Sequence, residues 1–134
     1  MKVRIGFIGT GRIANRHMEK LSTIKDATLV SVCDVEKKEA KKMTKFWGGK
    51  FYTNYREMLD KESLNAVYIC LPPFAHTDQE ILAAEKGINL FVEKPLALDL
   101  KKAWQISKII ENSGVISSVG YLYRYSDIVN RAKE

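Results

Sequence analysis

The chain has 134 residues, of which 46% are hydrophobic and 28% are charged, and its net charge is +6. This length and this composition predict one globular domain with its own core. They argue against a membrane protein, because no apolar run approaches the roughly 20 residues that span a bilayer, and against a nucleic-acid-binding protein, because the lysines are scattered over predicted helices without a recognised motif.

The first half of the chain alternates apolar stretches of strand length with helical patterns. Gly48 and Gly49 are expected to end the second helix, because glycine readily takes the left-handed conformation at a helix end. We predict strands at residues 3–8, 28–33 and 51–52, and helices at about 11–23 and 36–46.

The second half continues this alternation. Asn54 is expected to cap a short helix, because its side chain can accept from free backbone N–H groups. A longer helix should begin at about His76 and end at Gly87. Strands are predicted at residues 66–71, 88–92 and 115–119.

Two further helices are predicted near the carboxyl terminus. Asp99 should cap a helix over about 100–112, which Gly114 should end. Ser126 is expected to cap a last helix that runs into Glu134.

The fold class follows from the character of the strands and from the helices between them. The strands lack polar alternation, which is typical of a parallel sheet covered on both faces. We therefore predict an α/β doubly wound parallel sheet, a Rossmann fold, in a single domain over residues 1–120, with 121–134 as the start of another element. Ligands bind such sheets at the carboxyl ends of the strands.

A glycine-rich turn follows the first strand, in the order G-x-G-x-x-A that is typical of dinucleotide-binding turns. Gly9 permits the tight turn, and Gly11 lets a pyrophosphate approach the backbone at the positive end of the next helix. Asp34 ends the second strand, where a carboxylate can accept both ribose hydroxyls. The predicted site comprises Gly9, Thr10, Gly11, Arg12, Ile13 and Asp34. The alternative is a strand–helix turn without a ligand.

Three later segments should line the same crevice, because they follow the carboxyl ends of the remaining strands. These are Leu71, Pro72, Pro73, Phe74, Ala75 and His76 after the fourth strand, Glu93, Lys94 and Pro95 after the fifth, and Gly120 and Tyr121 after the sixth, with Arg124 close behind.

The cysteines and histidines do not indicate a metal site. Cys33 and Cys70 lie at the ends of apolar strands, and we interpret them as buried thiols in a reducing, cytoplasmic setting. His17 and His76 have no cysteine or histidine partner at ligand spacing. His17 is interpreted as a packing or surface residue.

Taken together, the glycine turn, the acidic end of the second strand, the Pro-to-His turn and Glu93-Lys94-Pro95 resemble the Gfo/Idh/MocA oxidoreductases. The segment from Gly120 to Tyr125 is also similar to that family. The resemblance implies an NAD(P)-dependent dehydrogenase acting on a sugar, polyol or related small hydroxy or carbonyl compound. It also implies that 121–134 begins the connection to an absent substrate domain, so the chain alone should turn over poorly.

The resemblance assigns the catalytic role to Lys94, beside the nicotinamide and the substrate hydroxyl. There it would relay the hydroxyl proton; the alternative is a surface lysine paired with Glu93. Glu93 is expected to contact the cofactor or orient the loop, Pro95 to fix the loop through a bond that is cis or trans, and His76 to begin a helix with its hydrogen bonds satisfied. Arg124 either reaches the crevice or anchors the missing domain.

The expected cofactor is NAD, because the charge of Asp34 would repel the extra phosphate of NADP. Lys37 and Lys38 lie close behind and leave NADP open. Two other functions remain open: a non-catalytic NAD(P)-responsive module, and a Rossmann-like scaffold that has lost its ligand. Self-association through the face left bare by the missing domain is also left open.

Overall fold

A six-stranded parallel sheet forms the centre of the molecule, which a computed structural model describes for residues 1–133. The strands lie in the order β3-β2-β1-β4-β5-β6, and every pairing is parallel. This is the doubly wound Rossmann order, which confirms the predicted fold class. The strands are β1 (Val3–Ile8), β2 (Ala27–Cys33), β3 (Lys50–Tyr52), β4 (Ala66–Ile69), β5 (Asn89–Val92) and β6 (Ser117–Val119).

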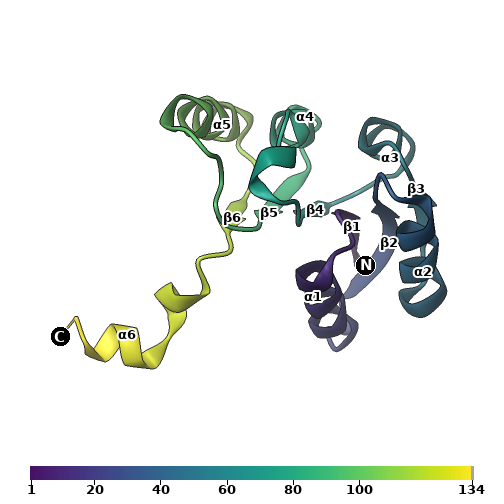
Figure 1. Cartoon of the computed structure of the whole chain (residues 1–134), viewed down its shortest axis with the longest axis horizontal. Helices are drawn as coiled ribbons and strands as arrows, with labels where there is room; N and C mark the ends of the chain where they lie inside the picture. Colours follow the sequence, from purple (N-terminus) through teal and green to yellow (C-terminus); the bar gives the residue numbers. More distant parts are fainter. Residues whose placement is uncertain (134) are drawn as a thin grey trace.

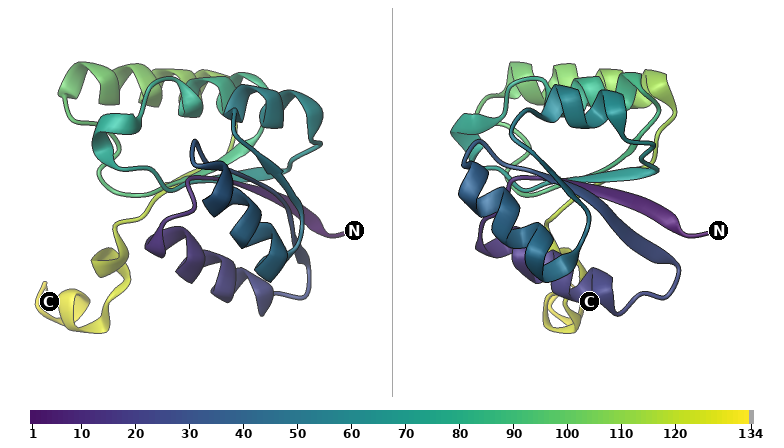
Figure 2. Two further views of the ribbon diagram at one scale, coloured as in Figure 1. Left: turned by 45° about the vertical axis from the view of Figure 1, so that its right-hand side comes forward. Right: turned by 90° about the vertical axis from the view of Figure 1, so that its right-hand side faces the viewer.

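Helices cover both faces of the sheet (Figures 1 and 2). One face carries α1 (Arg12–Ser22) and α2 (Lys37–Trp47), and the other carries α3 (Tyr55–Lys61), α4 (Gln79–Glu85) and α5 (Leu100–Ser113). Beyond β6 the chain leaves this body, and the short turn η2 (Leu122–Tyr125) and helix α6 (Asp127–Arg131) project away from it (Figure 1). None of the helices described within residues 1–133 is long and apolar enough to cross a membrane.

The side chains of β1 alternate between two hydrophobic cores, as expected of a strand buried on both faces. Ile5 and Phe7 pack with buried residues of α1 and α2, whereas Ile8 packs on the side of α3 and α4. β1 lies between β2 and β4, so the strand order reverses at its carboxyl end. A ligand crevice is expected at this point of the sheet.

Local capping chemistry sets several helix boundaries as predicted. The Asn54 side chain accepts from two backbone N–H groups at the start of α3. The Asp99 carboxylate accepts from the N–H of Lys102 at the start of α5, at 2.8 Å. Gly114 ends α5 in the left-handed conformation, with φ at +69°.

Two predicted boundaries are wrong. The helix expected from about His76 begins at Gln79, because the prolines after β4 form a short turn, η1 (Pro73–Ala75), and His76 itself is extended. Ser126 does precede α6, but its side chain makes no capping hydrogen bond, and α6 ends at Arg131. Glu134, the expected end of that helix, lies outside the described residues.

Candidate functional site

The turn after β1 is shaped by two glycines with different roles. Gly9 has φ at +91°, and a Cβ added there would lie 2.3 Å from the carbonyl oxygen of Cys70. Only glycine fits this position, because both the conformation and the close approach exclude a side chain. A Cβ added at Gly11 would meet nothing within 4 Å. The backbone at Gly11 therefore faces open space, as an approaching phosphate requires.

Helix α1 starts at this turn with its first N–H groups free of intrahelical partners. The first helical bond runs from the N–H of Asn15 to the carbonyl oxygen of Gly11, at 3.1 Å. No side chain caps this end, and the first turn of the helix carries no acidic residue. Free N–H groups and the positive end of the helix dipole favour an anion. The exposed Arg12 adds positive charge there.

Asp34, just beyond β2, is bound to the same turn. Its Oδ2 accepts from the N–H of Thr10 at 2.9 Å and from the Thr10 hydroxyl at 2.6 Å. Its Oδ1 accepts from the N–H of Glu36 at 2.9 Å. A carboxylate has about four acceptor positions, so about one remains, on Oδ1. We expected Asp34 to accept both ribose hydroxyls, but its remaining capacity suits one.

A cavity of about 430 Å³ connects these groups at the point where the strand order reverses. Its surface is mostly apolar, and it contains six of the predicted site residues: Gly9, Thr10, Gly11, Asp34, Leu71 and Pro72. Phe74 and Ala75, in the segment after β4 that was expected to line the crevice, also lie in its wall. The sequence interpretation missed Val35, Thr53, Tyr55 and Gln79. Val35, Thr53 and Tyr55 follow the carboxyl ends of β2 and β3, so the strand-end rule would have found them if applied to those strands too.

Two buried thiols form part of the cavity wall. Cys33 and Cys70 are free and buried, as predicted. Burial raises the pKa of each thiol to about 12, and the nearby carboxylates of Asp34 and Glu93 respectively act in the same direction. Both cysteines are therefore neutral apolar wall groups at neutral pH rather than nucleophiles.

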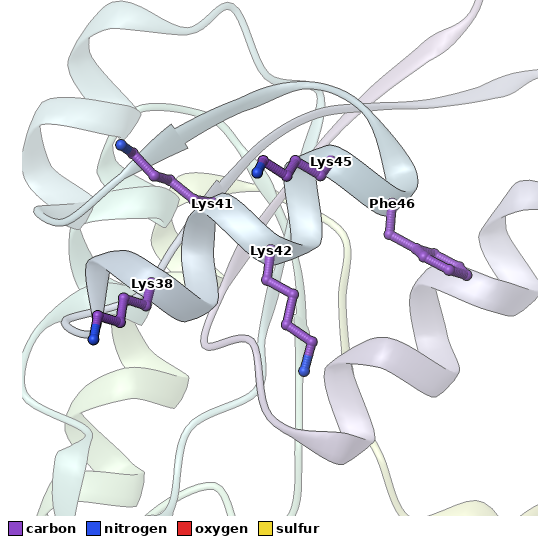
Figure 3. A pocket seen from close by; sticks show the side chains of 5 residues that line it. All are labelled: Lys38, Lys41, Lys42, Lys45 and Phe46. Atoms are coloured by element: carbon purple, nitrogen blue, oxygen red, sulfur yellow. The ribbon is translucent and has the colours of Figure 1, made fainter.

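A second hollow, of about 500 Å³, lies on the outer side of α2 and is built differently (Figure 3). Four lysines and Phe46 line it, and the lysine side chains spread away from one another rather than converging on one point. This arrangement is a solvated basic helix surface. The cavity at the strand ends is the one that combines a phosphate turn with an apolar wall.

The turn after β4 is fixed by a buried histidine–glutamate pair. His76 donates from Nδ1 to Glu80 and from Nε2 to the carbonyl oxygen of Leu71, at 3.3 Å for the second bond. The Leu71 carbonyl and an ionised Glu80 both accept, so both bonds form when both ring nitrogens carry hydrogen, which is the charged form of the ring. Burial opposes this charge, but the hydrogen bond and the negative charge of Glu80 outweigh it and raise the pKa of His76. As predicted, His76 has satisfied hydrogen bonds, although it lies before α4.

The mouth of the cavity is braced by contacts between α3 and the segment before α4. The Tyr55 hydroxyl donates to Asp78 Oδ1 at 2.5 Å, and Arg56 lies 2.6 Å from the other oxygen of the same carboxylate. Burial opposes ionisation of Asp78, but the bonds from Tyr55 and Arg56 outweigh it and lower its pKa. Tyr55 is thereby fixed as one wall of the cavity.

The turn after β5 carries Glu93 and Lys94. Glu93 Oε1 accepts from His17 Nε2 at 2.6 Å, and Oε2 accepts from the N–H of Lys94 at 3.2 Å. The Lys94 side chain is exposed, and within residues 1–133 no ion pair engages its ammonium. The alternative predicted an exposed lysine that forms an ion pair with Glu93. Lys94 is exposed, but it does not form that ion pair. The Lys94–Pro95 bond is cis.

The other predicted site residues do not line the cavity. Arg12 and Ile13 lie in the first turn of α1, and Pro73 begins the short turn η1. Arg124 lies exposed on the projecting segment after β6, so the structure does not bring it to the crevice. Within residues 1–133, no three His, Cys, Asp or Glu side chains gather to hold a metal ion.

Residues 3–121 match the family model described as the oxidoreductase family with an NAD-binding Rossmann fold. The chain belongs to this family, Gfo/Idh/MocA. The free helix end, the open space at Gly11, the Asp34 carboxylate and the apolar cavity all fit a dinucleotide. The chain is thus an NAD-binding Rossmann domain of an oxidoreductase, as the sequence predicts.

Characterised relatives are similar over nearly the whole chain. Glucose-6-phosphate 3-dehydrogenase of Bacillus subtilis is 36% identical over 97% of the chain, and scyllo-inositol 2-dehydrogenase of the same organism is 35% identical over 98%. The chain spans 37% and 39% of the length of these two relatives. A solved scyllo-inositol dehydrogenase from Lactobacillus casei, with bound NAD(H) and scyllo-inositol, superposes with a TM-score of 0.91 at 26% identity, over 99% of this chain and 40% of that one.

Proposed function

We propose that this domain holds NAD for hydride transfer to or from the hydroxyl-bearing carbon of a sugar or polyol, within an oxidoreductase that includes a substrate domain. The observation that carries the proposal is one shared sheet edge. The glycine turn, the Asp34 carboxylate and the Glu93-Lys94 turn follow the carboxyl ends of β1, β2 and β5, which all lie at the same edge of the parallel sheet. Relatives that act on inositol and glucose-6-phosphate support this substrate class.

The residues divide the work between binding and proton transfer. The free N–H groups of α1 hold the pyrophosphate, and Asp34 holds the ribose, where its negative charge disfavours the extra phosphate of NADP. NAD, when bound, accepts or supplies the hydride. Lys94 exchanges the proton of the substrate hydroxyl, because its ammonium is exposed, follows the same edge, and has no ion pair with a carboxylate among residues 1–133.

Calorimetry on the chain tests the binding part. NAD⁺ and NADH are expected to bind saturably, and NADP⁺ more weakly. Asp34→Asn removes the charge of this side chain but keeps one acceptor oxygen. The variant should therefore show a smaller difference between its affinities for NAD⁺ and for NADP⁺. Equal affinity for NAD⁺ and NADP⁺ in the unmodified chain would contradict the assigned role of Asp34.

Steady-state kinetics tests the chemical part. The product of the full reading frame that contains this domain is expected to reduce NAD⁺ with at least one of a set of inositols, sugars and sugar phosphates. Lys94→Ala should lower kcat by at least about a hundredfold while leaving the dissociation constant of NAD⁺ nearly unchanged. Lys108→Ala, on the outer helix α5, is the matched control. Turnover unaffected by Lys94→Ala would refute the catalytic assignment.

A further inference from the structure

The side chain of His17 connects the helix of the phosphate turn to the loop that carries Lys94. We propose that His17 is a positioning residue, which acts through Glu93 to fix the backbone of Lys94 relative to α1. The inference rests on the proposed function for the role of Lys94. It adds a second task to α1, which would hold the pyrophosphate at its first turn and the reacting loop one turn and a half further along.

The hydrogen bonds form a continuous chain from α1 to the loop. His17 Nε2 lies 2.6 Å from Glu93 Oε1, and Glu93 Oε2 lies 3.2 Å from the amide nitrogen of Lys94. The His17 and Glu93 side chains are only 24% and 13% exposed, so their contact is largely sheltered from water. A sheltered bond to a charged group is stronger and better oriented than an exposed one.

The His17 ring is held in place by two aromatic side chains from the sheet. Its centroid lies 5.4 Å from that of Tyr68 on β4 and 4.9 Å from that of Phe91 on β5. Tyr68 and Phe91 stack on each other with centroids 4.7 Å apart. The ring therefore has a fixed base on both strands, which limits the directions in which Nε2 can point.

Glu93 is confined from the opposite side as well. A Cβ added at Gly120 would lie 3.1–3.2 Å from the Glu93 carboxyl group, so the carboxylate fits closely against the chain just after β6. With both oxygens engaged inside the protein, Glu93 orients the loop and forms no ion pair with the ammonium of Lys94. This arrangement separates the residue that fixes the loop from the residue that would exchange the proton.

Two substitutions at position 17 separate positioning from packing. His17→Phe keeps an aromatic ring against Tyr68 and Phe91 but removes the donor. His17→Gln gives up the ring but places an amide N–H near the position of Nε2. If His17 only packs, His17→Phe should leave the loop of Lys94 unchanged and His17→Gln should disturb it. If His17 positions the loop, His17→Gln should leave the loop nearly unchanged and His17→Phe should disturb it.

The first measurement needs no cofactor and tests only the inference. Amide hydrogen exchange of Lys94, followed by NMR on the chain, is expected to be at least about tenfold faster in His17→Phe and within about threefold of the unmodified rate in His17→Gln. Unchanged exchange in His17→Phe would overturn the proposal. Should His17→Phe fail to fold, Glu93→Leu serves instead, because a leucine side chain has no oxygen that can accept from the N–H of Lys94. Unchanged exchange in Glu93→Leu would equally overturn the proposal.

The second measurement adds NAD⁺ and tells the two proposals apart. Reductive methylation of Lys94, quantified by mass spectrometry against exposed Lys108, should change at least about threefold when NAD⁺ binds. His17→Phe should abolish this change, and His17→Gln should retain it. An unmodified chain whose Lys94 is insensitive to bound NAD⁺ would contradict the proposed function, whereas the exchange result would still decide the role of His17. If the methylation of Lys94 in His17→Phe still changes fully when NAD⁺ binds, the role of His17 is refuted and the proposed function is not.

Discussion

The turn after β1 and the turns after β4 and β5 lie at the same edge of the sheet, but they are held by different means. The first depends on backbone geometry, with Gly9 at φ +91° against the carbonyl of Cys70. The other two each depend on a histidine–glutamate pair: His76 with Glu80, and His17 with Glu93. Both histidines of the chain thus hold turns in place.

This difference fits the tasks proposed for the turns. A phosphate is held by backbone N–H groups, so the turn that would hold it needs only a backbone path that brings them out. The turn after β5, which would present Lys94, needs its own orientation fixed, and a polar partner from the packed helix α1 does this with a directional bond. The turn after β4 supplies Leu71, Pro72 and Phe74 to the cavity wall, and the bonds of His76 fix that wall in the same way. The substitutions below act on one kind of turn at a time, from the largest expected effect to the smallest.

The buried pair at the turn after β4 should give the largest loss of stability. Glu80→Ala is expected to lower the free energy of unfolding by about 3 kcal/mol, because it leaves His76 buried without its charged partner and opens a cavity. The side chains of both residues are nearly inaccessible to solvent. Urea unfolding of the variant and of Glu85→Ala, an exposed glutamate on the same helix, measures the effect. A loss no larger than that of Glu85→Ala would show that the pair does not hold this turn.

The glycine at the turn after β1 should rank second. Gly9→Ala is expected to cost at least about 2 kcal/mol, because the new Cβ meets a backbone carbonyl and an L residue is strained at this φ. NAD⁺ affinity should fall as well, since relief of the clash displaces the turn from the start of α1. Urea unfolding and calorimetry on one variant check both effects. Stability close to that of the unmodified chain would mean that the turn relaxes without cost.

The charge on His76 predicts a pH dependence of smaller size. A raised pKa in the folded state adds stability that is complete below the unfolded pKa of about 6.5. That stability is lost as the pH rises through the folded pKa of His76. In Glu80→Gln the slope should become shallower or reverse, because the negative charge is gone and burial is then opposed mainly by the bond from His76 to the carbonyl oxygen of Leu71. Parallel slopes in the two proteins, measured by urea unfolding from pH 6 to pH 9, would contradict the assignment.

The contrast between turns held by backbone geometry and turns held by side-chain pairs also explains which features can be predicted from the sequence. Gly9, Asn54 and Asp99 satisfy requirements set by their immediate neighbours, namely a positive φ or free N–H groups within three residues, so their roles can be predicted from local pattern. The parallel pairing of the strands follows from the alternation of strands and helices. These local rules account for the fold and for the half of the site that is built from backbone.

The part of the site that is held by side chains depends on contacts between residues far apart in the sequence, and the spacing of residues does not predict such contacts. His17 and Glu93 are 76 residues apart, and the pattern around His17 indicates only a packed helical face. Tyr55 follows the carboxyl end of β3 and lines the cavity, but its bond to Asp78, 23 residues further along the chain, is another contact that sequence spacing does not indicate. The delayed start of α4 follows from the extended His76, whose ring bonds to Glu80 on that helix.

The smallest expected change in stability is also the sharpest test of the backbone turn. Gly11→Ala places a methyl group where nothing lies within 4 Å, at a backbone conformation with φ −65° that alanine adopts freely. Alanine is a poorer helix cap than glycine but restricts the unfolded chain, so the two effects should cancel to within about 0.5 kcal/mol. NAD⁺ affinity should nevertheless fall by about tenfold or more, because the methyl occupies the space that the pyrophosphate needs. If calorimetry finds NAD⁺ affinity intact in a stably folded Gly11→Ala chain, the phosphate does not lie against this turn.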